Sequence, residues 1–398
     1  MNSSIPPNQG ESKMWRTTTL GEDIVLVSGV HIDAVNYHDG PEGTPYLTGP
    51  SDFENGIIRA TRYTHAPIAI CKAGDILLTV KGSGTGTLAR ADAQYCISRQ
   101  LMAIRTRTWC QDFIFYVLAA NSRSYKTSAA GLIPGITREH VLETVFRVPS
   151  HAEQEAIAAV LSVWDQAIGQ TTALIAAKER LKQGLVEKLF DATIRFREFQ
   201  DIWDSRHLGD VFVERREPGI ENLPMLSVTL DSGVIPRDDI DKPVRSSLEY
   251  ADHRLVRAGD IAYNMMRMWQ GGCGIVAEDG LISPAYVACK PTKDIDSRFA
   301  HHLFHSRRMV YLFWAYSYGL TDDRRRLYFQ EFARIPVILP SVKEQKKIAA
   351  VIDNVDLEIA QLKRNSEALK KQKRGLMQQL LTGKVRVPEK LMKKAARS

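Results

Sequence analysis

The stretch that decides the fold occurs twice, first as Pro149-Ser150-His151-Ala152-Glu153-Gln154 and again as Pro340-Ser341-Val342-Lys343-Glu344-Gln345. From these motifs the two copies align without a gap over residues 148–196 and 339–387, at a constant offset of 191. Of the 49 paired positions, 17 are identical. A match of this length within one chain indicates an internal repeat. The sequence therefore predicts a duplicated architecture.

Shorter matches extend the repeat over most of the 398 residues. Trp15 recurs as Trp203, the run Lys-Ala-Gly-Asp-Ile at 72–76 recurs as Arg-Ala-Gly-Asp-Ile at 257–261, and Gly131 matches Gly319. The resulting order is globular block, helical segment, second globular block, second helical segment. The predicted boundaries are 1–13 (flexible tail), 14–148 (first block), 149–198 (central helical spacer), 199–338 (second block), 339–387 (C-terminal helical spacer) and 388–398 (basic tail).

Both helical segments begin with Pro-Ser-x-x-Glu, which is typical of a capping box. In such a box the serine hydroxyl accepts from the amide three residues on, and the glutamate reaches back to the serine amide. Apolar residues then recur in steps of three and four, a pattern typical of a coiled coil. They are Ile157, Leu161, Trp164, Ile168, Ile175, Leu185 and Leu189 in the first copy, and Ile348, Ile352, Val355, Ile359, Leu362, Leu369, Leu376 and Leu380 in the second.

An apolar stripe this narrow must be buried against another helix, and two copies in one chain are expected to pack on each other as an antiparallel pair. About 40 residues at 1.5 Å each give helices of roughly 60 Å. Gly184 and Gly375 occupy matched positions in the two helices. Because glycine is unfavourable inside a helix, we expect a close helix approach or a bend there, with a merely tolerated glycine as the alternative.

The globular blocks are predicted to be of mixed α and β structure, so the fold class is α+β. Residues 75–80 and 260–265 are β runs that enter glycine-rich turns, at 82–86 and 270–276, and each is expected to form a hairpin. Helical stretches are expected at 111–120 and at 297–316. The two helical segments are more similar to each other than the two globular blocks are. This difference suits a duplicated helical frame that carries two different recognition blocks.

Composition narrows the function only weakly. The net charge of +7 is concentrated at the C-terminus: residues 363–398 hold 12 Lys+Arg and 2 Asp+Glu, whereas the other 362 residues hold 41 and 44. This excess fits either nucleic-acid binding or a solvated helix face. No run approaches the roughly 18 apolar residues of a membrane span. The five cysteines, with no C-x-x-C pair, predict neither a disulfide framework nor a zinc site and suit a reducing cytosol.

A search for catalytic motifs finds no convincing match. Residues 283–286 (Ser-Pro-Ala-Tyr) lack the amide or acid of a base methyltransferase site, and no phosphate-binding G-x-x-x-x-G-K loop is present. Gly82, Gly84 and Gly86 do not have the G-x-G-x-x-G spacing of a dinucleotide-binding loop. Glu344-Gln345-Lys346 is better explained by the capping box than by a nuclease site. His301, His302 and His305 lack an evident third ligand for a metal. The sequence thus favours a non-catalytic protein without cofactors.

Taken together, the repeat and its motifs resemble the DNA specificity subunit of Type I restriction–modification enzymes. The stretches that carry the resemblance are Ala73-Gly74-Asp75-Ile76, Ala258-Gly259-Asp260-Ile261, Arg267-Met268-Trp269-Gln270-Gly271, Ile282-Ser283-Pro284-Ala285-Tyr286, Ile133-Pro134-Gly135-Ile136-Thr137 and Arg324-Arg325-Arg326-Leu327-Tyr328. The resemblance spans roughly Trp15 to Val387. The first block departs from the pattern, because its turn lacks Arg-x-Trp-x-Gly.

The resemblance implies two target recognition domains joined by two long antiparallel coiled-coil helices with pseudo-two-fold symmetry. Each domain would read one half of a bipartite asymmetric target in double-stranded DNA, and the helices would set the unread gap. The implied partners are two methyltransferase (modification) subunits and restriction (helicase-nuclease) subunits. The chain itself would be non-catalytic and cytoplasmic, without a membrane partner.

Base reading in the major groove uses Arg for guanine and Asn or Gln for adenine. Candidate DNA-binding residues therefore lie in or beside the glycine-rich turns and the segments that match the family signatures. They are Lys81, Ser83, Thr85, Arg90, Thr137, Arg138, Asn264, Arg267, Gln270, Arg324, Arg325 and Arg326. Two alternatives stay open at this stage: an enzyme that acts on DNA by itself, and a coiled-coil scaffold that does not bind nucleic acid.

Overall fold

The computed structural model describes residues 15–54, 57–82, 84–128, 135–240, 248–321 and 324–395. The predicted N-terminal tail 1–13, Ser83, Gly131 and the signature residues Ile133 and Pro134 lie outside this part. Residue contacts divide the chain into two units: unit 1 comprises 1–171 and 365–398, and unit 2 comprises 172–364. Each unit thus combines one globular block with the adjoining ends of both long helices.

The central sheet of unit 1 is antiparallel, with the strand order β2-β11-β8-β9. A second sheet of order β6-β3-β10-β7 contains one parallel pair, β3 with β10. β1 pairs with β12, which joins the start of the block to its end. The strands are β1 (Arg16–Thr19), β2 (Ile24–Ser28), β3 (Thr44–Leu47), β4 (Phe53–Glu54), β5 (Ile57–Ile58), β6 (Arg62–Thr64), β7 (Ile70–Cys71), β8 (Ile76–Thr79), β9 (Leu88–Arg90), β10 (Tyr95–Ile97), β11 (Leu101–Thr106) and β12 (Val145–Val148).

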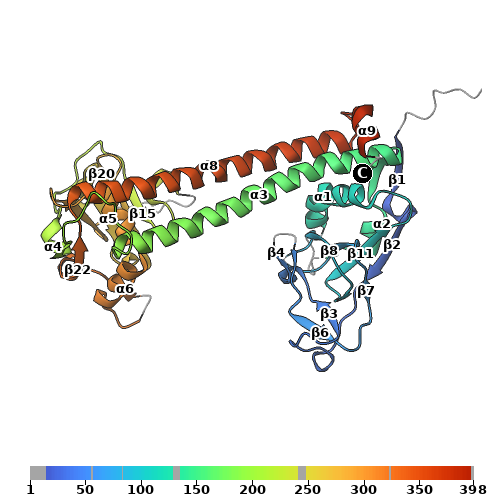
Figure 1. Cartoon of the computed structure of the whole chain (residues 1–398), viewed down its shortest axis with the longest axis horizontal. Coiled ribbons are helices and arrows are strands. Elements are labelled where there is room, and N and C mark those ends of the chain that lie inside the picture. The colour runs from blue at the N-terminus through green and yellow to red at the C-terminus, as the bar shows by residue number, and fades with distance from the viewer. Residues whose placement is uncertain are drawn as a thin grey trace, which may run out of the picture. The chain divides into compact units, whose positions relative to one another are not determined.

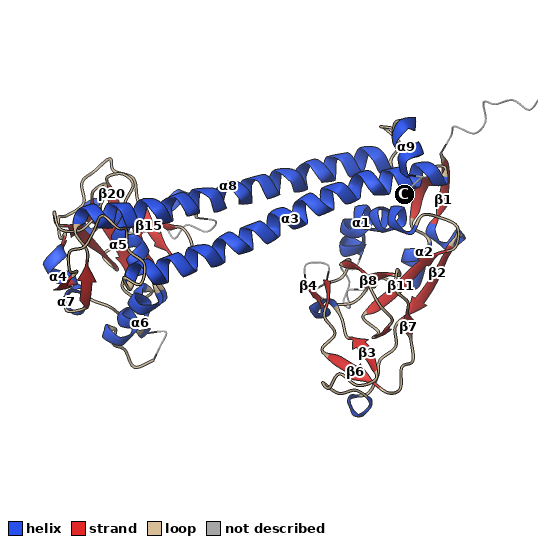
Figure 2. Cartoon of the chain, viewed as in Figure 1, coloured by secondary structure: helices blue, strands red, loops and turns tan. Residues whose placement is uncertain are grey.

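The central strands are buried on both faces, which explains their continuous apolar runs. Because side chains alternate along a strand, Ile76 and Leu78 enter the core beneath helix α1 (Gln111–Ser128), whereas Leu77 enters a separate core against the second sheet. Figure 2 shows α1 between this sheet and the long helix α3 (His151–Phe190). The short helix α2 (Arg138–Leu142) precedes β12, and α9 (Glu389–Ala395) follows the C-terminal long helix.

Unit 2 repeats this skeleton with different additions. Its antiparallel sheet has the order β14-β21-β18-β19, and β13 pairs with β22 as β1 does with β12. The strands are β13 (Asp204–His207), β14 (Phe212–Glu214), β15 (Leu226–Thr229), β16 (Gly233–Pro236), β17 (Arg254–Val256), β18 (Ile261–Asn264), β19 (Cys273–Ile275), β20 (Gly280–Ile282), β21 (Tyr286–Pro291) and β22 (Pro336–Leu339). The helices are α4 (Leu208–Val211), α5 (Ser297–Phe304), α6 (Arg307–Tyr316), α7 (Phe329–Ala333) and α8 (Val342–Leu381).

The predicted hairpins and long helices are present. β8 pairs with β9 and β18 with β19, each across its glycine-rich turn. α3 and α8 are unbroken helices of 40 residues each (Figure 1). Within unit 2, Glu179 pairs with Lys363 and Lys182 with Asp356, so the paired residue in α8 falls as the number in α3 rises. The two helix segments are therefore antiparallel there. Among the described helices, none is long and apolar enough to cross a membrane.

The serine half of the predicted capping box is present at Ser341, whose hydroxyl accepts from the Glu344 amide at 3.4 Å. The motif glutamates do not act as capping-box acids, so that half of the prediction is wrong. The Glu153 carboxylate accepts from Trp15 Nε1 at 3.1 Å and from Arg386 Nε and Nη2 at 2.5 and 2.6 Å. In the same way, Glu344 accepts from Trp203 Nε1 at 3.2 Å and from Arg195 Nε and Nη2 at 3.0 and 2.8 Å. Both carboxylates are 1% exposed. Burying such a charge without a cation costs more free energy than leaving a helix N-terminus without a second cap, so the carboxylates pair with arginines.

We call each of these arrangements a Trp–Glu–Arg clamp. In unit 1 the clamp joins the chain before β1, the first turn of α3 and the segment after α8. In unit 2 it joins the chain before β13, the first turn of α8 and the segment after α3. The following glutamine has a matched role, because Gln154 Oε1 accepts from the Cys110 amide and Gln345 Oε1 accepts from the Asp296 amide. The clamps thus close each unit with parts of the chain far apart in sequence.

Two further expectations are corrected. The single helix expected over 297–316 is broken at His305-Ser306, because Ser306 caps α6 by accepting from the Met309 amide at 3.4 Å. A close helix approach at Gly184 and Gly375 is also wrong. A Cβ added to either glycine would have no neighbouring atom within 4 Å, so both glycines are tolerated at open positions.

Replacing either helical glycine should stabilise the protein. We expect Gly184→Ala and Gly375→Ala each to raise the free energy of unfolding by up to about 1 kcal/mol, because alanine restricts the unfolded chain and favours the helix. For Gly383→Ala, in contrast, we expect no gain in the free energy of unfolding, since Gly383 has a φ of 72° and lies against the Trp15 ring. Urea unfolding followed by circular dichroism measures all three. A loss of stability in Gly184→Ala would show that this position is not open.

Breaking the clamp of unit 1 should cost far more than removing a neighbouring charge. Arg386→Ala leaves the buried Glu153 carboxylate without a cation, for which we expect a loss of about 3 kcal/mol. The control is Lys384→Ala, because Lys384 is exposed and no described carboxylate pairs with it; its change should stay within about 0.5 kcal/mol. Equal unfolding midpoints for the two variants would show that the ion pair contributes nothing.

Candidate nucleic-acid interface

Three loops meet at one edge of the central sheet in unit 1. They are the turn after β8 (residues 80–86), the loop between β10 and β11 (98–100) and the segment before α2 (135–138). The Val80 amide donates to Gln100 O at 2.8 Å, and the Ile136 amide donates to Val80 O at 2.8 Å. We call these three loops loop cluster 1.

Unit 2 builds the same arrangement from the corresponding residues. The Met265 amide donates to Ala285 O at 3.4 Å, and the Leu327 amide donates to Met265 O at 2.9 Å. These bonds join the turn after β18 (265–272), the loop before β21 (283–285) and the segment before α7 (324–328), which we call loop cluster 2. The loops that carry most of the predicted residues are therefore adjacent in each unit, a placement that the sequence did not specify.

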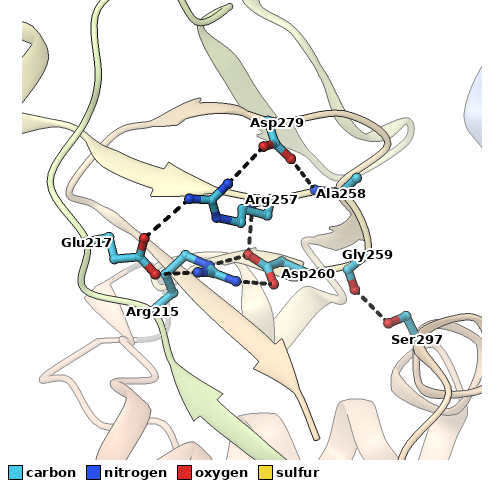
Figure 3. A network of polar contacts seen from close by, with 8 residues as sticks. All are labelled: Arg215, Glu217, Arg257, Ala258, Gly259, Asp260, Asp279 and Ser297. Carbon is cyan, nitrogen blue, oxygen red and sulfur yellow. Dashed lines mark hydrogen bonds and ion pairs between the residues drawn. The ribbon is translucent and has the colours of Figure 1, made fainter. Parts of the chain in front are cut away.

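A buried aspartate fixes the opposite end of the strand that leads into each cluster. In unit 2 the Asp260 carboxylate accepts from Arg215 Nε at 2.6 Å and Nη2 at 3.2 Å, and from the Arg257 amide (Figure 3). The Ser297 hydroxyl donates to Gly259 O, which ties α5 to the same turn. These contacts explain the Ala-Gly-Asp-Ile signature: glycine adopts a φ of 90°, and aspartate orders the turn.

Unit 1 uses the same turn with an arginine from another strand. Asp75, 2% exposed, accepts from Arg105 Nε and Nη2 at 2.6 Å each. Arg105 lies on β11, whereas Arg215 follows β14. The hydrogen bonds to Asp75 raise the pKa of Arg105 above its ordinary value, although burial opposes the charge. Each pair holds its strand rigidly, and the strand in turn positions the loop cluster at its far end.

Most of the residues predicted to bind DNA in unit 1 have structural roles. Thr85 is buried and its hydroxyl donates to Gly82 O. Arg90 pairs with Asp112 and lies over the Phe115 ring. Thr137 caps α2, and Arg138 donates to Leu26 O at 2.8 Å.

Lys81 and Arg138 are the exposed cations among the predicted residues of this cluster that the structure describes, and Arg138 is held by the Leu26 carbonyl. Two exposed residues of loop 98–100, Arg99 and Gln100, were not predicted. The repeat alignment could have pointed to these two residues, because at the offset of 185 their loop corresponds to the signature loop Ser283-Pro284-Ala285.

Loop cluster 2 presents more of its predicted groups. Arg267 and Gln270 are exposed and hydrogen-bonded to each other, from Nη1 to Oε1 at 3.2 Å. Asn264 instead stabilises its own turn by accepting from the Met266 amide. Arg325 donates to Ser317 O and lies over the Trp314 ring, whereas Arg324 and Arg326 are exposed.

Exposed aromatic side chains on and beside α6 flank loop cluster 2. Trp314 stacks with Tyr311, and Tyr318 packs against Tyr328. Aromatic rings beside arginines are common at nucleic-acid surfaces. Helix amphipathicity could have shown that α6 is half-exposed. It could not have shown that α6 lies beside the arginine run 324–326, which follows from the Arg325 guanidinium over the Trp314 ring.

The histidines of α5 do not form a recognisable metal centre. No cluster of three or more His, Cys, Asp or Glu in the described part of the chain is suited to a metal. His302 Nε2 is hydrogen-bonded to Asp353 at 2.7 Å. Burial lowers the pKa of His301 to about 3, aided by the nearby His305, His302 and Lys182, so His301 is neutral at physiological pH. The three histidines line a cavity of about 700 Å³ beside α3.

Comparisons with known proteins point to one family. A sequence model of the Type I restriction modification DNA specificity domain matches residues 15–179. The chain is 24% identical to the Type I restriction enzyme MjaVIII specificity subunit of Methanocaldococcus jannaschii, over 94% of this chain and 93% of the relative.

Solved structures share the fold at low identity. An S subunit of a Type I restriction-modification system from M. genitalium is 16% identical with a TM-score of 0.58, covering 94% of this chain and 98% of the other. A chain solved in work on complex assembly and conformational transition of the type I R-M system is 16% identical with a TM-score of 0.59, covering 96% and 100%. The first part of the chain thus matches the specificity-domain model, and the chain over nearly its whole length is similar to a Type I restriction enzyme specificity subunit, whose solved counterparts share its fold.

Proposed function

We propose that this chain recognises a bipartite, asymmetric sequence in double-stranded DNA, with loop cluster 1 reading one half and loop cluster 2 the other. The observation that carries the proposal is the repeated backbone scaffold of the two clusters, which presents different side chains in each unit. One scaffold with two side-chain sets suits recognition of two unlike sequences. A scaffold protein that never touches DNA would have no use for this difference.

The chemistry of the exposed groups supports recognition in the major groove. Arginine and glutamine side chains match the hydrogen-bonding edges of guanine and adenine. Exposed cations such as Lys81, Arg324 and Arg326 suit phosphate contacts, which position a protein without specifying sequence. The apposed turns and their backbone hydrogen bonds hold these groups at fixed places, so that little conformational entropy is lost on binding.

The chain is proposed to act without catalysis of its own, within a complex. Two methyltransferase subunits would modify one base in each half-site after flipping it out of the duplex, and restriction subunits would cleave unmodified DNA in the cytoplasm. No cofactor is proposed for this chain. The long helices α3 and α8 would dock the methyltransferase subunits and set the number of unread base pairs between the half-sites.

The test of this function is the methylation pattern of the assembled complex. The chain is coexpressed with its modification subunits in a host that lacks other methyltransferases, and the genome is read by long-read methylome sequencing. We expect one bipartite motif with an unread gap. Methylation without a sequence motif would contradict the function, as would methyl transfer or cleavage by the chain alone.

A change in helix length provides a second, independent measurement. Seven residues inserted in α3 and seven at the matched position in α8 lengthen each helix by about 10.5 Å. If the helices set the gap, it should grow by about 3 bp, at about 3.4 Å per base pair, while both half-site sequences stay unchanged. As the control, existing residues at the two insertion sites are replaced by alanine, which leaves the length of both helices unchanged. An unchanged gap in an active complex would refute the role of helix length.

A further inference from the structure

The two loop clusters carry the same pair of residue types on different loops. In unit 2, Arg267 and Gln270 lie on the turn after the central strand, and the adjoining loop holds only Pro284 and Ala285. In unit 1 the turn after the strand holds glycine, serine and threonine after Lys81, whereas the adjoining loop holds Arg99 and Gln100. Gln100 and Ala285 occupy the same place, since each carbonyl accepts the equivalent bond, from Val80 and Met265.

The loop that carries Arg99 and Gln100 is well ordered by its own contacts. Ser98 is buried, and its hydroxyl donates to Thr48 O at 2.6 Å and accepts from the Gln100 amide at 3.2 Å. In unit 2, Ser283 accepts from the Ala285 amide at 3.3 Å in the same way. Both side chains of the pair are exposed, and within the described residues no hydrogen bond or ion pair holds either of them.

The Gln100 side chain lies against Gly49 and near Gly82, the first glycine of the glycine-rich turn. A methyl group on Gly49 would come within 2.5 Å of Gln100 Oε1, and one on Gly82 within 3.8 Å. The lack of a side chain at these two glycines therefore leaves the space in which the glutamine lies. In unit 2 the corresponding turn holds larger residues, with Met268 fully buried between the exposed Arg267 and Gln270.

Three other arginines in or beside the clusters are held by partners within the fold, whereas Arg324 and Arg326 are exposed. Arg90 and Arg138 are held by a carboxylate and by a backbone carbonyl, and Arg325 is held by a carbonyl and an indole ring. A side chain that must read bases has to be exposed and free to exchange partners. Arg99 meets that condition in unit 1, and Arg267 meets it in unit 2, where its described side-chain partner is Gln270.

We infer that Arg99 and Gln100 determine the specificity of the half-site read by unit 1, as the counterpart of Arg267 and Gln270 in unit 2. Each arginine contacts a guanine through the N7 and O6 acceptors. Gln270 positions the Arg267 guanidinium, whereas Gln100, which lacks such a bond, contacts a base itself. This inference rests on the proposed function and names the residues and the base for each half.

The experiment uses the full chain coexpressed with its modification subunits, with methylomes compared among variants. Arg99→Ala should reduce discrimination at one guanine of one half-site by about 10-fold or more, the usual worth of a bidentate contact, and leave the other half unchanged. Arg267→Ala should do the same in the other half only. Gln100→Ala should relax one further position in the half affected by Arg99→Ala.

The matched control is Arg107→Ala, which removes an exposed arginine at the opposite end of β11. Its motif should equal that of the wild type, and thermal unfolding of each variant verifies that it folds. A motif unchanged by Arg99→Ala, or weakened equally in both halves, overturns the inference even when the wild-type complex shows a bipartite motif. If the wild-type complex shows no methylation motif at all, that result contradicts the proposed function itself.

Discussion

The first turn of each long helix carries a glutamate whose carboxylate is 1% exposed, and the rest of the architecture depends on how that charge is paired. A buried carboxylate must be paired, because its desolvation is costly. The partner arginine comes from the segment that follows the other long helix, and the tryptophan comes from the chain entering the globular block. One carboxylate therefore holds three segments together, and unit 1 is completed only by residues at the end of the chain.

This arrangement explains why the helical segments retain so many identities while the globular blocks differ. The clamp, the glutamine that follows it and the apolar stripe all constrain the same residues of the helices. The exposed side chains of the loop clusters carry no such constraint, because the mutual placement of the loops rests on backbone hydrogen bonds and on buried residues such as Val80, Ile136 and Leu327. Exposed groups can therefore change, or move from one loop to its neighbour, without disturbing the frame.

The Asp75 and Asp260 turns show the same separation of frame and variation. Both aspartates order the same backbone turn and are both paired with arginine, yet the arginine is supplied by different strands. What is retained is the buried charge pair and the glycine with positive φ. The arginine can be supplied by different segments of the chain, because the buried carboxylate must be neutralised whatever its partner's position in the sequence.

The sequence by itself determined the repeat, the long helices, the hairpins and the similarity to Type I specificity subunits, because periodicity, turn residues and motif order are local or additive along the chain. It could not determine the role of Glu153 and Glu344, since a capping box and a clamp share the same local pattern and differ only in distant partners. It also could not determine that Thr85, Arg90 and Arg138 make contacts within the fold, or that Arg99 and Gln100 are exposed beside the glycine-rich turn. Tertiary structure alone decided these points, because exposure and hydrogen-bond partners arise from segments far apart in sequence, here as far apart as Glu153 and Arg386.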